Sequence, residues 1–126
     1  MKTALRLMFI GAGLLNAQDT KVTPLVTKAL VGIPGKEGSL LRVELAPGSL
    51  GSVHRHNAHV FVYVIEGSVV MRVKGGTEVT LGPGQTFTEN PDDIHVVGRN
   101  ASKTKPAVFL AFFIKDEGAP AVVPVP

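Results

Sequence analysis

Short runs of β-branched and aromatic residues, separated by glycine and proline turns, make up most of this chain. Residues 60–65 and 107–114 are two such runs, and neither contains a charged side chain. We expect residues 60–65 to form a strand buried on both faces, because they lack polar alternation. Gly75-Gly76 and Gly82-Pro83-Gly84 have the sequences of tight turns. The pattern predicts an all-β protein whose strands close into a jelly-roll barrel.

The length and composition fit one compact domain. The chain has 126 residues, of which 44% are hydrophobic, with 14 glycines and 9 prolines. A chain of this length can enclose one core. The formal net charge is +3 and the lysines and arginines form no run, so we expect no nucleic-acid partner. The chain has no cysteine, which leaves histidine, carboxylate and water as metal ligands.

Residues 1–17 have the composition of a secretory signal peptide. Lys2 and Arg6 form a basic start, residues 7–15 are apolar, and Ala17 supplies a small residue at the end. We expect cleavage after Ala17, which makes the mature protein periplasmic or secreted. The apolar segment is shorter than the about 20 residues that span a bilayer, so we expect no membrane association after cleavage. An uncleaved anchor and an ordinary amphipathic helix are the alternatives.

The rest of the chain divides into three segments. Residues 18–39 are polar at first and then rich in turns, and we expect an extended lead-in or an edge strand there. Residues 40–115 hold the strand-like runs and form the predicted barrel. Residues 116–126 are rich in proline, which lacks the N–H group that a sheet needs. We therefore expect a strap over the barrel or a loose tail.

Three histidines have a spacing that suits metal ligands. His54 and His56 lie two positions apart at the start of the expected buried strand, where alternate side chains share a face. His95 follows after two predicted hairpins, which can bring it back to the pair. Neutral imidazole is the commonest protein ligand of divalent transition metals. The spacing therefore predicts one metal ion bound by His54, His56 and His95, joining the two halves of the barrel.

Other polar residues near these histidines have several candidate roles. His59 becomes a fourth ligand if a β-bulge turns it inward, but in a regular strand its side chain faces outward. One of the three carboxylates Glu89, Asp92 and Asp93 could orient a ligand imidazole through its second nitrogen. Loop carboxylates are more often solvated or turn-forming, and we expect that role for these three.

Two segments of the chain resemble the two sequence motifs of the cupin superfamily. The first runs from Gly48 through His54-Arg55-His56 and Val60 to Gly67, and the second from Gly84 through Asn90-Pro91-Asp92 and His95 to Asn100. The family pattern has a glutamate ligand where this chain has Val60, and a proline and a glycine at Asn90 and Asp92. The match over residues 40–114 implies a small single-domain cupin, whose fold is a double-stranded β-helix. It also implies a metal site in which water or another group replaces the glutamate.

The resemblance implies a function only in outline, because cupins carry out many chemistries. Our first hypothesis is an iron-dependent, oxygenase-type enzyme that acts on a small molecule, since some three-histidine cupins use iron(II). Mn, Ni, Zn and Cu are the other candidate metals. The alternative is a non-catalytic periplasmic protein that binds a metal or a small ligand. A purely structural barrel leaves the histidines unexplained, and a homodimer is compatible with each hypothesis.

Overall fold

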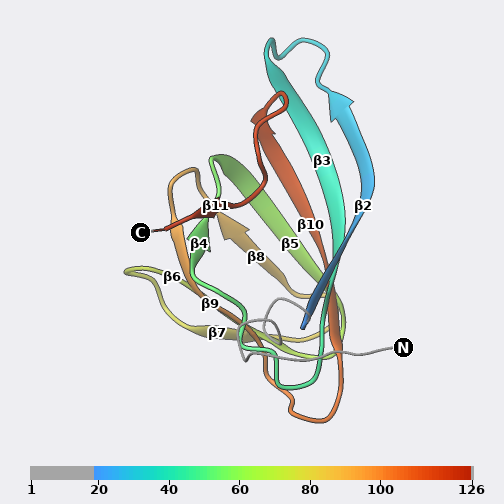
Figure 1. Cartoon of the computed structure of the whole chain (residues 1–126), viewed down its shortest axis with the longest axis vertical. Coiled ribbons are helices and arrows are strands. Elements are labelled where there is room, and N and C mark those ends of the chain that lie inside the picture. The colour runs from blue at the N-terminus through green and yellow to red at the C-terminus, as the bar shows by residue number, and fades with distance from the viewer. Residues whose placement is uncertain (1–18, 126) are drawn as a thin grey trace, which may run out of the picture.

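The structure of the chain, a computed structural model, describes residues 19–125. The predicted signal peptide lies outside the described residues. Two antiparallel sheets of five strands each face one another (Figure 1). The described residues contain no helix, and thus none that could span a membrane. This arrangement confirms the predicted all-β class and is a double-stranded β-helix, or jelly roll.

The first sheet contains the long strands. Its order is β2-β3-β10-β5-β8. The strands are β2 (Thr20–Ala29), β3 (Lys36–Leu45), β10 (Ala107–Asp116), β5 (Ala58–Glu66) and β8 (Thr86–Glu89). The apolar run at residues 107–114 lies within the central strand β10, which pairs with β3 on one side and with β5 on the other.

The second sheet is made of shorter strands, and its order is β11-β4-β9-β6-β7. The strands are β11 (Val123–Pro124), β4 (His54–Arg55), β9 (Ile94–Asn100), β6 (Val69–Val73) and β7 (Val79–Leu81). The turn at Gly75-Gly76 joins β6 to β7, and the Gly76 amide donates to the carbonyl of Val73 at 2.9 Å. The hairpin expected at the two glycines is present, but its turn spans residues 73–76 with Lys74 and Gly75 at the centre, and the return strand β7 begins only at Val79.

The hydrophobic core lies between the two sheets. Val60, Val62 and Val64 project inward from β5 and belong to one buried cluster with Met71 of β6. The residues between them face the other way, and Tyr63 is 50% exposed. The expectation that residues 60–65 are buried on both faces is therefore wrong. No described element covers the outer face of β5, so this strand alternates between core and surface although its sequence does not alternate in polarity.

Both ends of the described chain contribute edge strands. β2 pairs with β3 from Thr20 to Ala29, so the segment expected as a lead-in or edge strand contains an edge strand. β3 already begins at Lys36, before the expected start of the barrel at residue 40. At the other end Val123 of β11 pairs with Arg55 of β4. The C-terminal segment thus lies against the second sheet as a strap, beside the strand that carries His54 (Figure 1).

Candidate metal centre

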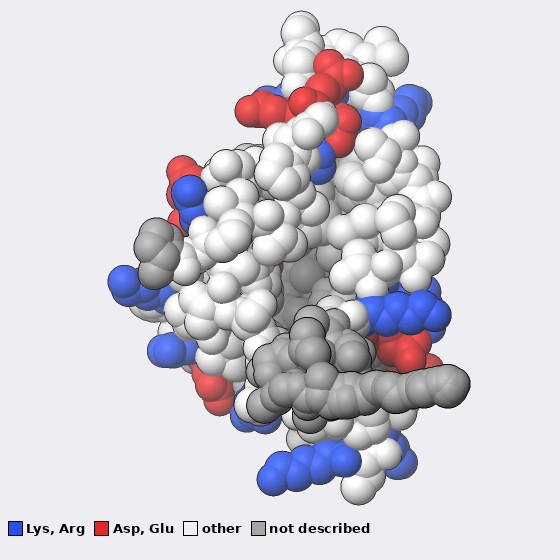
Figure 2. All heavy atoms as spheres, viewed as in Figure 1, with Lys and Arg blue, Asp and Glu red and all other residues white. Residues whose placement is uncertain are grey.

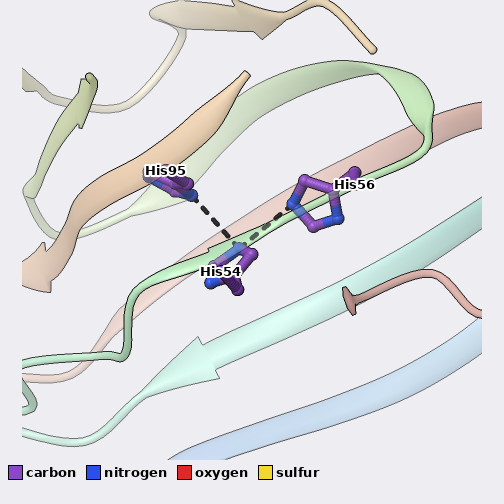
Figure 3. Close-up of side chains that lie close together, drawn as sticks. All are labelled: His54, His56 and His95. Atoms are coloured by element: carbon purple, nitrogen blue, oxygen red, sulfur yellow. Dashed lines mark hydrogen bonds between the residues drawn. The ribbon is translucent and has the colours of Figure 1, made fainter. Parts of the chain in front are cut away.

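The three predicted histidines meet at one point between the sheets. His54 on β4 and His95 on β9 are direct partners across the second sheet, and His56 follows one residue after β4. Nε2 of His54 lies 3.1 Å from Nε2 of His56 and 3.3 Å from Nδ1 of His95 (Figure 3). One nitrogen from each ring therefore lies within 4.8 Å of the other two. The convergence predicted from their spacing is present.

The strands that position the histidines differ from those expected. His54 and His56 do not open the long strand β5, which begins at Ala58. They belong to the two-residue strand β4 and the residue after its end, in the opposite sheet. His54 and His95 thus belong to the second sheet, and His56 lies in the connection that follows β4. None of the three lies on a strand of the first sheet, so the expectation that they join the two halves of the barrel is wrong. A strand break at residues 56–57 lets the chain cross from one sheet to the other there.

Backbone carbonyls fix the orientation of two of the imidazoles. Nδ1 of His54 donates to the carbonyl of Ser52 at 2.9 Å, and Nδ1 of His56 donates to the carbonyl of Ala121. A carbonyl can only accept, so both rings carry their proton on Nδ1 when they are neutral. Their Nε2 atoms are then bare acceptors that face each other at 3.1 Å. Two lone pairs at this distance repel unless a proton or a metal ion lies between them.

Burial keeps these rings in the neutral form that binds metal. His95 is 6% exposed, and burial, with the charges of His54 and His56, lowers its pKa to about 4. Burial also lowers the pKa of His56, although the bond to Ala121 opposes the shift. A desolvated imidazole resists protonation because the cation loses its hydration. Both rings are thus neutral at pH 7 and available as ligands.

The two nitrogen separations from His54 fit ligands of a single transition-metal ion. A metal–imidazole bond is about 2.0–2.1 Å long, which separates two nitrogens on one ion by about 2.9–3.4 Å for octahedral to tetrahedral angles. The separations of 3.1 Å and 3.3 Å from His54 fall within that range. The bare acceptors and their spacing fit a divalent transition metal, and they do not discriminate among such metals.

A buried carboxylate that the sequence analysis placed in solvent faces the histidines. Glu89 is 4% exposed, and its Oε2 lies 3.8 Å from Nε2 of His56 and 3.6 Å from Nδ1 of His95. Burial, with a smaller contribution from the charge of Asp93, raises the pKa of Glu89 to about 7. The expectation of a solvated or turn-forming residue is wrong for Glu89, because β8 continues through Glu89 and its last residue is buried.

The other polar candidates lie away from the centre. His59 is exposed on β5, with its neighbours Ala58 and Val60 buried, so it faces outward as a regular strand requires. Asp93 accepts a hydrogen bond from the Asn90 amide at 2.8 Å, which is a turn contact. Asp92 has a φ of 70°, the left-handed conformation that glycine favours, at the position where the cupin motif has glycine. The turn role expected for these two aspartates is confirmed.

A cavity of about 470 Å³ opens above the three histidines. Its walls are mostly apolar and come from both sheets and from the C-terminal strap. Lining side chains include Val22, Leu41, Val43, Val62, Met71, Phe109, Phe113 and Val122. Among residues 19–125, the lining contains no lysine or arginine, and Glu89 is its one carboxylate. On the face seen in Figure 2, uncharged residues cover most of the middle and charged side chains gather toward the periphery.

Two facing antiparallel sheets with three convergent histidines define a β-barrel protein with a candidate metal centre inside. The model of the Cupin domain family matches residues 41–113 of this chain. The match covers more than half of the chain, so the chain belongs to the cupin family, as its two motifs indicate. No protein with a curated description matches the chain.

Several solved structures share the fold. The DMSP lyase DddQ from Ruegeria pomeroyi DSS-3 has a TM-score of 0.69 at 18% identity, over 90% of this chain and 54% of that one. An oxalate oxidase in complex with glycolate has a TM-score of 0.63 at 24% identity, over 83% of this chain and 54% of that one. This chain spans about half the length of these two proteins. The Cupin_2 domain of an XRE-family transcriptional regulator from Enterobacter cloacae has a TM-score of 0.58 at 28% identity, over 78% of this chain and 97% of that domain.

Proposed function

We propose that this cupin binds one divalent transition metal, iron(II) first among the candidates, through His54, His56 and His95. We further propose that it is an oxygenase-type enzyme acting on a small molecule. One observation carries the proposal. The bare Nε2 atoms of His54 and His56 face each other at 3.1 Å, at the base of a cavity large enough for a small ligand. A cation is the group that satisfies both of them.

The three histidine ligands support a metal ion that keeps free coordination positions for a substrate. A divalent metal held on one side by histidines keeps free positions, at which it would polarise a small molecule bound beside it. The hydrogen bonds from His54 to Ser52 and from His56 to Ala121 hold the two rings in the tautomer that offers Nε2. The apolar walls and the burial of His56 and His95 lower the local polarity around the centre, which strengthens electrostatic interactions there.

The lining of the cavity supports an uncharged, mainly apolar substrate. Oxalate oxidase was solved with glycolate, a small anion. The part of the cavity lining that the structure describes has no lysine or arginine to receive such a charge, and Glu89 disfavours a second anion near it. A volume of about 470 Å³ is in the range of ordinary small-molecule sites. A neutral diketone or aromatic diol that chelates through two oxygens meets these requirements.

The experiment that tests this function is metal analysis of the purified protein, followed by an oxygen-uptake screen. We expect about one equivalent of a divalent transition metal. We also expect oxygen uptake with a diketone or an aromatic diol, and none with the His54→Ala variant. Stoichiometric metal without turnover of any substrate would instead support the alternative, a non-catalytic protein that binds metal or a small ligand. A protein that binds no metal would contradict the proposed enzyme and would leave only a non-catalytic protein that binds a small ligand.

We also propose that the mature protein is periplasmic or secreted. The support is the N-terminal sequence, in which Lys2 and Arg6 precede an apolar stretch that ends near Ala17. Cell fractionation and N-terminal sequencing of the processed protein test this location. A homodimer remains a proposal, and light scattering of the purified protein measures its mass.

A further inference from the structure

We propose that Glu89 is a fourth metal-binding residue, which supplies from β8 the carboxylate that the cupin motif places at residue 60. The inference rests on the proposed metal site. It concerns a residue that lies within the second motif, between Gly84 and Asn90, but is not one of the residues that define the motif. This residue is contributed by the sheet that carries none of the three histidines.

The strand register places Glu89 where an acid from residue 60 would act. Val60 of β5 and Glu89 of β8 are direct partners in the antiparallel pairing of these two strands. Partners across an antiparallel pair project to the same face, with their Cβ atoms about 4.5–5.5 Å apart. Val60 is 1% exposed and lines the cavity together with the histidines. A carboxylate at 89 therefore enters the same space as one at 60, from the neighbouring strand.

The contacts of Glu89 leave its carboxylate without a cation. Its Oε2 lies 3.8 Å from a ring nitrogen of His56 and 3.6 Å from one of His95, and both distances are beyond hydrogen-bond range. Its other oxygen, Oε1, is buried with no hydrogen-bond partner. A buried carboxyl group without a partner destabilises the fold by the full cost of its desolvation. An ion bound to the histidines next to Oε2 would remove that cost.

A carboxylate at this position also lowers the net charge of the metal centre. Three neutral imidazoles leave the full charge of a divalent ion in place, whereas an anionic ligand lowers it by one unit. His54 and His95 come from the second sheet, His56 from the connection after β4, and Glu89 from the first sheet. An ion bound to all four residues therefore joins the two sheets, which the histidines alone do not.

Cobalt(II) binding to matched variants tests this inference. Glu89→Gln keeps the shape but removes the anion, and Glu89→Val removes the ligand. The swap variant Val60→Glu with Glu89→Val moves the carboxylate to the partner position. Glu78→Gln is the control, since it removes an exposed carboxylate from the loop before β7. Each variant is first checked for cooperative thermal unfolding, and its Co²⁺ affinity and visible absorption spectrum are then measured.

We expect Glu89→Gln and Glu89→Val to lower the Co²⁺ affinity by about 100-fold or more, since changes to groups that only support ligands already cost 10–100-fold. The spectrum of the bound cobalt should change as well, because a ligand has been lost. The swap should recover at least tenfold of the lost affinity, and Glu78→Gln should match the wild type.

Three results would overturn the inference. Wild-type affinity in Glu89→Gln would remove Glu89 from the site while leaving the three-histidine proposal intact. A weaker Glu89→Gln with an unchanged cobalt spectrum would make Glu89 a supporting residue and not a ligand. A wild-type protein that binds no Co²⁺ would overturn the proposed metal function together with the inference.

Discussion

At the scale of single residues, the centre depends on how firmly each imidazole is held. The backbone carbonyls of Ser52 and Ala121 fix His54 and His56. The ring of His95 is held by packing, because its Nε2 is buried without a hydrogen-bond partner and lies against Gly98. A change that moves any one ring separates nitrogens that now lie within 4.8 Å of one another.

The histidines differ in their predicted contribution to metal binding. We expect His54→Ala, His56→Ala and His95→Ala each to lower the affinity for a divalent ion by about 100-fold or more, because each removes a converging nitrogen. His59→Ala should change it less than about threefold, since His59 is exposed on β5. Titration with Co²⁺ measures all four. A loss in His59→Ala equal to the others would mean that His59 is also a ligand.

Gly98 provides the space that the His95 ring occupies. A Cβ atom at residue 98 would lie 2.9 Å from Cε1 and 3.0 Å from Nε2 of His95, so Gly98→Ala must displace the ring. We expect a loss of roughly 1–3 kcal/mol in the free energy of unfolding and at least about tenfold in metal affinity. Gly82→Ala is the control, because its nearest neighbour would be 3.8 Å away. Urea unfolding and metal titration measure both variants. If Gly98→Ala and Gly82→Ala had the same unfolding free energy and the same metal affinity, Gly98 would not be needed to make room for the His95 ring.

Glu89, whose burial the sequence did not predict, shows why single positions are hard to assign. The histidines could be predicted, because a spacing of two positions sets a common face within one short segment. Glu89 could not be placed in the same way, since its burial depends on the pairing of β8 with β5. One local signal was present. Phe87 and Glu89 alternate with Thr86 and Thr88, so an inward Phe87 implies an inward Glu89 if the strand continues to residue 89.

At the scale of elements, the C-terminal strap supports the centre. β11 pairs with β4, and the carbonyl of Ala121 accepts the proton of His56 Nδ1. The sequence left open whether this proline-rich segment is a strap or a loose tail. Proline cannot donate to a sheet, but the edge position that it occupies beside the short strand β4 tolerates it. That pairing partner is distant in sequence, so composition alone could not select the strap.

Removal of the strap should therefore weaken metal binding. A variant that lacks residues 121–126 loses both the Ala121 carbonyl and β11, and we expect its metal affinity to fall by about 10–100-fold. A variant that lacks only residues 125–126 keeps β11 and serves as the control. Isothermal titration with Co²⁺ compares the two. Unchanged affinity in the shorter variant would show that His56 needs no contact from this segment.

A buried ion pair joins β3 to β10 at the end of the first sheet. Glu37 and Lys115 are direct partners across these strands, and the Lys115 side chain is 7% exposed. The hydrogen bond from Lys115 lowers the pKa of Glu37 below its usual value of 4.5. A lowered carboxyl pKa contributes stability above pH 4.5, and this contribution is lost as the pH falls below that value.

The variant Glu37→Gln tests this pair. We expect it to lower the free energy of unfolding at pH 7, because the buried ammonium of Lys115 loses its anionic partner. The difference from the wild type should shrink as the pH falls from 7 to 3, because protonation of the Glu37 carboxylate removes the same negative charge that the variant lacks. Urea unfolding at the two pH values measures the difference, with Glu78→Gln as an exposed control. A difference that is the same at pH 3 as at pH 7 would contradict the pairing.

At the scale of the whole molecule, the turn residues determine most of what could be predicted. Glycine and proline pairs mark where strands end, and the resulting number of short strands is typical of a jelly roll. The distribution of strands between the two sheets is not a local property. His54 begins a separate short strand and not the long one, because β4 pairs with β9 while β5 pairs with β10. The exposure of the outer face of β5 is likewise not a local property, because it depends on which elements pack on that strand.

The most direct test of the account is the thermal stability of the protein with and without metal at pH 7.5. An ion that binds the folded barrel alone stabilises it by about 2.7 kcal/mol at a hundredfold excess over its dissociation constant. For a domain of this size that corresponds to a rise of roughly 10 °C in Tm. We predict this rise for the wild type with Co²⁺ relative to chelator, and none for His54→Ala. A wild-type Tm that is the same with Co²⁺ and with chelator would contradict the claim that this cupin holds a metal ion at its three histidines.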